Sequence, residues 1–292
     1  MHPEPLFYIF GNGVYAYGIC IAVGIIACFA FLLVTMKIKK FNELSSDAII
    51  LIGIVATGLG FLSGMLFQAT YNYIENPKGG FNFGSGMTFI GGLIGGVVIF
   101  LGVWNLYMYV IRPRTKDIKW LGGEMNATLT DALPFIPIGI AIAHAFGRLG
   151  CFFGGCCYGA EAEWGLPCAG DPYTNVIPTQ LFEMAFLFVL AAVMAVLYFK
   201  FKLNYNFSVY LIAYGIWRFA IEYVRADDRG QIFKGVDLTP SQFWSILMVI
   251  LGIGYIFVQI YVFSKMMKHP EKAVEAAVEE GETPAAPTDS AE

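Results

Sequence analysis

Long apolar runs separated by short polar stretches dominate the chain from its start to about residue 264. A helix that crosses a bilayer needs about 20 mostly apolar residues, and several runs reach that length. The pattern predicts seven membrane-spanning helices, at residues 13–36, 48–71, 88–111, 130–153, 178–199, 207–226 and 239–264. Only 14% of the residues are charged, too few to give a soluble protein of this size a polar surface. We therefore expect an all-α membrane protein.

Basic residues predict the orientation of the seven helices, because Lys and Arg are enriched in cytoplasmic loops. With the N-terminus outside and the C-terminus cytoplasmic, the outer loops carry only four of them: Lys78, Arg225, Arg229 and Lys234. The cytoplasmic side then carries twelve, namely Lys37, Lys39, Lys40, Arg112, Arg114, Lys116, Lys119, Lys200, Lys202, Lys265, Lys268 and Lys272. The first dozen residues lack the basic region of a cleaved signal peptide, so we expect the first helix to remain.

Composition divides the chain into a membrane domain and a tail. Residues 269–292 are rich in Glu, Ala and Pro, which cannot bury a core, so we expect a disordered acidic cytoplasmic tail. Residues 1–268 then form a single integral-membrane domain. The chain has no basic patch with interleaved aromatics and no phosphate-binding Gly-Lys loop, so nucleic acid and nucleotide partners are not expected.

Glycines four residues apart recur in the second and third predicted spans. This spacing lets helix backbones approach closely in lipid. We expect tight helix packing at Gly60/Gly64, Gly91/Gly95 and Gly92/Gly96.

Charged residues inside the predicted spans indicate a functional site, since a charge at the bilayer centre costs about 2.5–3.5 kcal/mol on insertion scales. Arg148 lies near the outer end of the fourth span, and Arg218, Glu222 and Arg225 share one face of the sixth. Planar guanidinium groups suit bidentate capture of a phosphate. Two helices presenting arginines to the outer leaflet predict a site for a phosphate-bearing lipid head group. The alternative is an Arg218–Glu222 ion pair that only fastens helices together.

Six strings between about residues 10 and 265 resemble, in order, motifs of the phosphatidylglycerol–prolipoprotein diacylglyceryl transferases. They are YAYG (15–18), GMTFIGGLIGG (86–96), GRLGCFFGG (147–155), PTQLFE (178–183), YGIWRFAIEYVR (214–225) and LTPSQ (238–242). The resemblance implies that Arg148 binds the lipid phosphate and that Arg218 and Glu222 act in catalysis. By the same analogy, Tyr17 and Glu183 line the substrate cavity.

The chain departs from the family's usual fourth-span motif, GRxGNFxNGE. Cys151 and Gly154 stand where that motif has Asn, and Cys156 stands where it has Glu. Two usual histidines are also missing, their places being taken by Ile90 and Ile177.

His144 offers a replacement for a missing general base. It lies four residues before Arg148 on the same helix face, and imidazole titrates near neutral pH. We therefore predict His144 as a catalytic residue. The alternative is a neutral histidine that donates to a backbone carbonyl or to Asp131.

Four cysteines, Cys151, Cys156, Cys157 and Cys168, fall at the predicted outer end of the fourth span or in the following loop. That compartment permits disulfides, and a bond from Cys156 or Cys157 to Cys168 would staple the loop. A redox or acyl-relay thiol near Arg148 is a second interpretation. A metal site is not expected, because the adjacent cysteines lack the spacing of familiar zinc knuckles and the loop has no histidine.

The resemblance implies transfer of diacylglyceryl from phosphatidylglycerol to the lipobox cysteine of prolipoproteins, recognised through their signal peptides. The transfer forms a thioether and releases glycerol phosphate. The enzyme would lie in the bacterial cytoplasmic (inner) membrane among other membrane lipids, with its active site toward the outer side. No cofactor is implied, because the displacement needs neither redox chemistry nor a nucleotide. The alternatives are a diverged member with another acceptor, a membrane thiol-disulfide oxidoreductase, a non-catalytic lipid-binding protein or scaffold, and a transporter.

Overall fold

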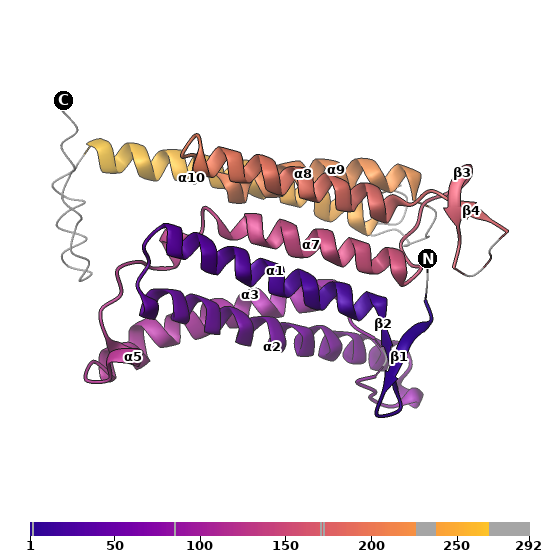
Figure 1. Ribbon diagram of the computed structural model, residues 1–292, viewed down its shortest axis with the longest axis horizontal. Helices are drawn as coiled ribbons and strands as arrows, with labels where there is room; N and C mark the ends of the chain where they lie inside the picture. Colours follow the sequence, from indigo (N-terminus) through magenta and orange to yellow (C-terminus); the bar gives the residue numbers. More distant parts are fainter. Residues whose placement is uncertain (2, 85, 170, 172, 226–237, 269–292) are drawn as a thin grey trace. The chain divides into compact units, whose positions relative to one another are not determined.

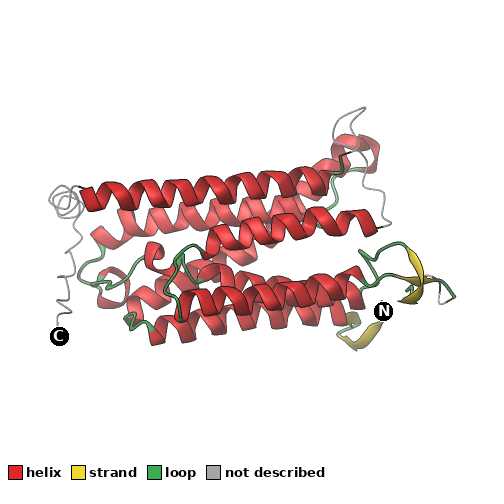
Figure 2. Cartoon of the chain, turned by 90° about the horizontal axis from the view of Figure 1, so that it is seen from above, coloured by secondary structure: helices red, strands yellow, loops and turns green. Residues whose placement is uncertain are grey.

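The computed structural model describes residues 1, 3–84, 86–169, 171, 173–225 and 238–268 (Figure 1). The predicted acidic tail at 269–292 lies outside these residues, as do Arg229 and Lys234. Figure 2 shows that helices make up nearly all of the described chain and that strands are confined to two small hairpins. The elements are β1 (Pro5–Ile9), β2 (Asn12–Tyr15), α1 (Ala16–Ile38), α2 (Glu43–Glu75), η1 (Pro77–Gly79), α3 (Phe89–Leu106), η2 (Tyr107–Ile111), α4 (Arg112–Arg114), α5 (Lys119–Gly122), α6 (Leu129–Ala132), α7 (Ile136–Phe153), β3 (Glu161–Pro167), β4 (Asn175–Val176), α8 (Thr179–Phe199), α9 (Asn206–Ile221), η3 (Glu222–Val224) and α10 (Pro240–Lys268).

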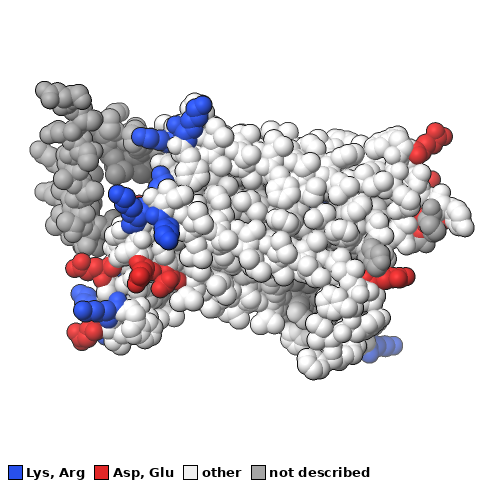
Figure 3. Space-filling model, in the orientation of Figure 1, with Lys and Arg blue, Asp and Glu red and all other residues white. Residues whose placement is uncertain are grey.

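The expected all-α membrane architecture is confirmed. Within the described residues, six helical segments are long and apolar enough to cross a membrane: Ala16–Ile38, Glu43–Ile74, Gly91–Arg114, Ile136–Phe153, Thr179–Phe199 and Pro240–Tyr261. Many large apolar side chains on them are exposed, among them Leu51 and Val98. On the face that Figure 3 shows, charged side chains gather at the ends of helices and the surface between them is uncharged.

The sixth predicted span is not among these six segments. It forms α9, whose 16 residues extend about 24 Å, shorter than a hydrocarbon core of about 30 Å. The three-residue helix η3 continues it to Val224. The count of seven spans and the placement of the termini therefore stay predictions.

The fourth predicted span, residues 130–153, is divided in the structure. A short helix, α6, ends at Ala132, and α7 begins at Ile136. Pro134 stands between them and Pro137 occupies the first turn of α7. A proline removes a backbone donor and clashes with the preceding turn, so it is tolerated at a helix start but not inside one.

The described chain divides into two compact units, of which one is formed by residues 25–139. In this unit α2 packs against α3 through the glycines that the sequence singled out. A methyl group added at Gly60 would lie 3.2 Å from the carbonyl oxygen of Gly92 and 3.2 Å from Cα of Gly96. The predicted close approach of these two helices is confirmed.

The other unit comprises residues 1–24 and 140–292, within the described ranges, and contains every predicted site residue. In it α9 packs against both α8 and α10 (Figure 1). The buried face of α8 is polar at the start of the helix and apolar further along. Leu187 and Met194 are fully buried apolar residues, whereas Thr179, Gln180 and Glu183 bury polar groups in the first turns of the helix.

Candidate functional site

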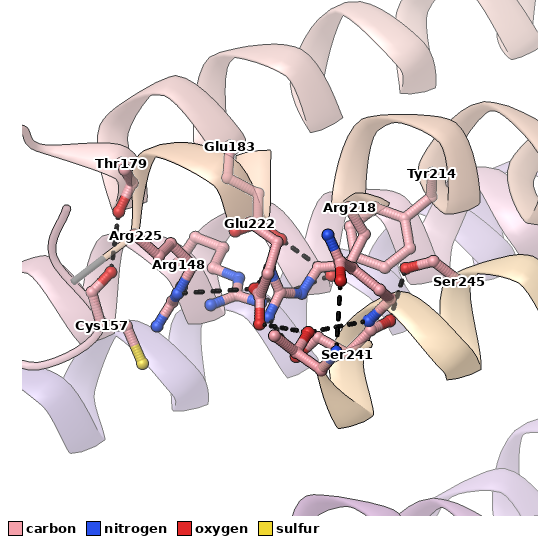
Figure 4. A network of polar contacts seen from close by, with 12 residues as sticks. Arg148, Cys157, Thr179, Glu183, Tyr214, Arg218, Glu222, Arg225, Ser241 and Ser245 are labelled. Carbon is pink, nitrogen blue, oxygen red and sulfur yellow. Dashed lines mark hydrogen bonds and ion pairs between the residues drawn. The ribbon is translucent and has the colours of Figure 1, made fainter. Parts of the chain in front are cut away.

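A buried carboxylate links α7, α8 and α9. Glu183 of α8 is fully buried, and its Oε1 lies 2.9 Å from Nη2 of Arg148 on α7. The hydroxyl of Tyr214 on α9 donates to the same oxygen at 2.7 Å, and Arg148 Nη2 donates to this hydroxyl at 3.4 Å. Three helices thus meet through one charged triad (Figure 4).

A second charged group lies on the same side of α9. Nη1 of Arg218 lies 2.7 Å from Oε2 of Glu222, and Nε of Arg225 lies 3.9 Å from that oxygen. The expected shared face of these three residues is therefore confirmed. Two residues at the start of α10 complete the group: Ser241 accepts from Nη2 of Arg218 at 2.6 Å, and Thr239 donates to Oε1 of Glu222 at 2.9 Å.

The two arginines predicted to grip a phosphate are both paired with carboxylates. The alternative of an Arg218–Glu222 ion pair is thus realised, and Arg148 has its own partner in Glu183. Arg225, the third arginine of this network, lies beside Glu222 as well. The contacts of Arg148 within the described residues use Nη2 alone, which leaves its Nε and Nη1 donors for an anion.

His144 lies beside this network, and in the described part of the chain it hydrogen-bonds neither Asp131 nor a backbone carbonyl, the two predicted alternatives. Its Nδ1 lies 3.0 Å from the hydroxyl of Tyr210, and its ring meets the ring of Tyr214 edge-on at 4.7 Å. Asp131 instead forms the capping box of α6 with Thr128. Two tyrosines of α9 therefore fix the imidazole one helical turn before Arg148.

Tyr17 lines a cavity of about 680 Å³ at the start of α1. The lining also includes Gly154 and Cys156, which follow one another closely at the end of α7. The two helices approach tightly here, because a methyl group at Gly150 would lie 3.1 Å from the carbonyl oxygen of Tyr17. Within the described residues, Arg148, Glu183, Arg218 and Glu222 do not belong to this lining, although Tyr17 packs beside Gly150, two residues after Arg148.

All six cysteines lie among the described residues, and no disulfide joins any two of them. The sulfurs of Cys151, Cys156 and Cys157 instead lie within 4.8 Å of one another. Cys168 is not part of this cluster; its backbone N–H donates to Thr174 in the loop between β3 and β4. The reasoning from spacing that excluded a metal site therefore missed a three-sulfur arrangement.

A Schellman motif at the end of α7 produces this cluster. The N–H of Cys156 donates to the carbonyl of Cys151 at 3.2 Å, and the N–H of Gly155 donates to Phe152 at 3.2 Å. Gly155 takes the left-handed conformation, with φ of 66°, that this motif requires. The motif brings the side chains of its first and last residues together, and here both are cysteines.

Cys157 follows in an uncommon conformation for a residue other than glycine, with φ of 66°. Its carbonyl accepts from Thr179 at 2.8 Å, and the carbonyl of Cys156 accepts from Gln180 at 2.7 Å. Hydrogen bonds from the Cys151 and Cys156 thiols, together with the guanidinium of Arg225, lower the pKa of the Cys157 thiol. The first turn of α8 thus holds the cysteine pair in place.

Sequence reasoning missed Tyr214, Thr239 and Ser241 as parts of the charged network. Tyr214 stands four residues before Arg218, so the helical spacing that grouped Arg218 with Glu222 also places Tyr214 on that face. Thr239 and Ser241 lie in the LTPSQ string, but their contact with α9 depends on the packing of α10.

Comparison with known proteins agrees with this architecture. Residues 4–258 match the family model of the prolipoprotein diacylglyceryl transferases. A phosphatidylglycerol–prolipoprotein diacylglyceryl transferase of Clostridium tetani is 31% identical over 260 residues, which is 85% of this chain and 94% of the relative. The enzyme of that name from Coxiella burnetii is 31% identical over 265 residues, covering 86% of this chain and 93% of the relative. The chain therefore belongs to the prolipoprotein diacylglyceryl transferase family.

Proposed function

We propose that the protein transfers the diacylglyceryl group from phosphatidylglycerol to the cysteine thiol of a prolipoprotein. The match of the family model to residues 4–258 carries this proposal. The names of the relatives give both substrates. The reaction forms a carbon–sulfur bond, breaks the carbon–oxygen bond to the phosphate and releases glycerol phosphate. The comparisons do not favour a thiol-disulfide oxidoreductase.

The charged network supports this chemistry because the guanidinium groups of Arg148 and Arg218, on two different helices, are the kind of donors that bind a phosphodiester. As the carbon–oxygen bond breaks, the phosphate gains negative charge. Donors that are already in place stabilise this charge most in the transition state. Arg148 is the group assigned to the phosphate, since Glu183 and Tyr214 hold its Nη2 and leave two other nitrogens for the ligand.

Arg218 and Glu222 have a different role in this proposal. Arg218 is bound by Glu222 and by Ser241, so it contributes positive potential from a fixed position. Glu222 orients Arg218 and also lies near Arg225. His144 is the proposed general base, and Tyr17 lines the cavity where the acceptor or an acyl chain would enter.

The chain is a multi-pass membrane protein, by its apolar helices and its family. We place it in the bacterial cytoplasmic membrane with the active site toward the outer side. The excess of basic residues in the loops assigned to the cytoplasm supports this orientation.

The test is a reaction of the purified protein with phosphatidylglycerol and a lipobox peptide, followed by measurement of released glycerol phosphate. We expect release that depends on the cysteine of the peptide and a peptide product that carries diacylglyceryl. A peptide with serine in place of that cysteine is the control. Release without any peptide would indicate a lipase instead, and absence of release with a folded protein would contradict the proposal.

A further inference from the structure

The three-sulfur cluster has the dimensions of a metal site. Two sulfurs bound to one tetrahedral zinc ion stand about 3.8 Å apart, given a zinc–sulfur bond of about 2.3 Å. The sulfurs of Cys151, Cys156 and Cys157 lie within 4.8 Å of one another. The largest separation thus exceeds that of two sulfurs on one zinc ion by no more than about 1 Å.

The backbone around the cluster is held by residues outside it. Thr179 and Gln180, both buried in the first turn of α8, donate to the carbonyls of Cys157 and Cys156. Cys157 keeps a left-handed conformation that a non-glycine residue adopts only when its surroundings impose it. The arrangement is thus fixed before any ion binds, as a metal site requires.

The donor set of the cluster suits zinc. Cysteine thiolates are among the usual ligands of zinc in proteins. The side chain of Arg225 hydrogen-bonds the sulfur of Cys157. An arginine donating to a ligand sulfur is the kind of outer contact that orients metal ligands.

One coordination position of such an ion would remain open. Structural zinc sites use four protein ligands, whereas catalytic sites use three and keep a position for water or substrate. Cys156 is exposed and lines the cavity that Tyr17 also lines. An ion bound by Cys156 would therefore lie beside a space that a second molecule can enter.

We propose that Cys151, Cys156 and Cys157 bind one zinc ion, and that its open position takes the thiol of the acceptor cysteine. The first half of this inference stands on the cluster alone, and the second half rests on the proposed transfer reaction. A thiol that coordinates zinc is deprotonated, and the thiolate is the nucleophile. The site would thus activate the acceptor in a chain that lacks the family's usual histidines at positions 90 and 177.

The reaction balances without a change of oxidation state. The acceptor thiol loses its proton on binding zinc, and the sulfur then attacks the diacylglyceryl carbon that carries the phosphate oxygen. A carbon–sulfur bond forms as the carbon–oxygen bond breaks, and the electron pair of that bond leaves with glycerol phosphate. The thiol proton passes to His144, the proposed general base, or to solvent, and zinc remains divalent.

Metal binding is tested first, without substrates. Reduced, metal-free full-length protein in lipid nanodiscs is titrated with Zn²⁺, and with Co²⁺ as a spectroscopic probe. We expect one ion per chain and, with Co²⁺, the sulfur-to-metal charge-transfer absorption of thiolate ligands. Cys156→Ser and Cys157→Ser are each expected to weaken binding more than tenfold. Cys168→Ser is the matched control, since it removes a thiol that is outside the cluster.

Alkylation of cysteines in the wild-type protein tests metal binding without any substitution, so it remains informative if a variant fails to fold. Zinc is expected to protect Cys151, Cys156 and Cys157 from a thiol reagent and to leave the reaction of Cys168 unchanged. Two results would overturn the metal site. One is Co²⁺ binding without thiolate absorption, and the other is a purified protein whose cluster cysteines are joined in a disulfide that zinc and reductant do not replace.

The acceptor step is tested by adding a lipobox peptide to the Co²⁺-loaded protein in the absence of phosphatidylglycerol. A change in the charge-transfer spectrum that needs the peptide cysteine would support thiol coordination, and this result does not depend on turnover. An unchanged spectrum would contradict it. Transfer at full rate by the metal-free protein would overturn the role of zinc in activating the acceptor and would leave the proposed function intact. Thiol coordination without any transfer would support the zinc site and contradict the proposed function.

Discussion

At the scale of single residues, the arrangement of the charged network depends most on Glu183. Its carboxylate is fully buried, holds Arg148 and Tyr214 through one oxygen, and ties α8 to both neighbouring helices. Within the described residues, its second oxygen has no hydrogen-bond partner. Removing one partner from a buried ion pair leaves a charge uncompensated, at a cost of about 3–5 kcal/mol. Substitutions here must therefore keep a cation beside Glu183 if catalysis is to be separated from folding.

Arg148→Lys meets that condition. The ammonium group still pairs with Glu183 but cannot place two parallel donors on a phosphate. We expect the protein to fold and the rate of transfer to fall by about 10²–10³, the loss typical for one donor to a developing oxyanion. The measurement is kcat with phosphatidylglycerol and a lipobox peptide, beside thermal unfolding in detergent. Arg114→Lys, at an exposed arginine, is the control, and an unchanged kcat in Arg148→Lys would remove Arg148 from the phosphate site.

Tyr214→Phe tests the hydrogen bond that completes the triad. The variant keeps the ring but removes the hydroxyl that donates to Glu183 at 2.7 Å. We expect the free energy of unfolding to fall by about 1–3 kcal/mol, because a buried carboxylate loses a donor. Unfolding in mixed micelles measures this change. Tyr223→Phe is the matched control at an exposed tyrosine and is expected to leave stability unchanged; equal effects of the two substitutions would contradict the role of Tyr214.

His144→Phe tests the proposed general base. Phenylalanine preserves a ring beside Tyr214 but cannot accept a proton, so transfer is expected to slow by about 10²–10⁴. Tyr210→Phe removes only the partner of Nδ1 and should have a smaller effect. Both rates are measured by release of glycerol phosphate. Full activity of His144→Phe would end this assignment and would leave activation of the acceptor to the cysteine cluster.

At the scale of elements, apolar runs located the helices well because a membrane helix depends on composition along the chain. Predictions of helix ends and of side-chain partners failed where they depend on single prolines or on tertiary contacts, which composition does not reveal. Pro134 divides the fourth predicted span, and α9 ends at Ile221 instead of residue 226. The partner of Arg148 was not predictable, since Glu183 meets it only through the packing of α8 against α7. The cysteine cluster was in principle predictable, because GG after a helix favours a Schellman motif that returns Cys156 to Cys151.

Gly155→Ala tests whether that helix end builds the cluster. Alanine in a left-handed conformation costs roughly 1–2 kcal/mol, and the added methyl would also collide with Ala169. We expect lower stability and weaker binding of Co²⁺ by the cysteines, measured by unfolding and by charge-transfer absorption. Gly147→Ala, inside α7, is the control: no described atom lies within 4 Å of its added methyl, so alanine should stabilise the helix by up to about 1 kcal/mol. Unchanged metal binding in a folded Gly155→Ala variant would contradict this role.

At the scale of the whole molecule, the orientation of the chain decides which side of the membrane the site serves. The bias of twelve basic residues against four predicts that the loop between β3 and β4 is outside and that the α4–α5 region is cytoplasmic. In the proposed function, the acceptor prolipoprotein would reach the enzyme from the outer side. An active site on the outer side requires the seven-span topology, in which α9 crosses the membrane as the sixth span. With 16 residues, α9 is short for a membrane helix.

Labelling of single cysteines in intact cells tests this topology. Tyr173→Cys and Trp120→Cys replace exposed residues of those two regions in a variant whose native cysteines are serine. A membrane-impermeant thiol reagent should label residue 173 in intact cells and residue 120 only after the membrane is opened, because only the first loop would face outward. Opened cells supply the control, in which both positions should react equally. The reverse labelling pattern would show that the chain has the opposite orientation in the membrane. Labelling of both positions in intact cells would mean an even number of membrane crossings between them, which contradicts the seven-span arrangement.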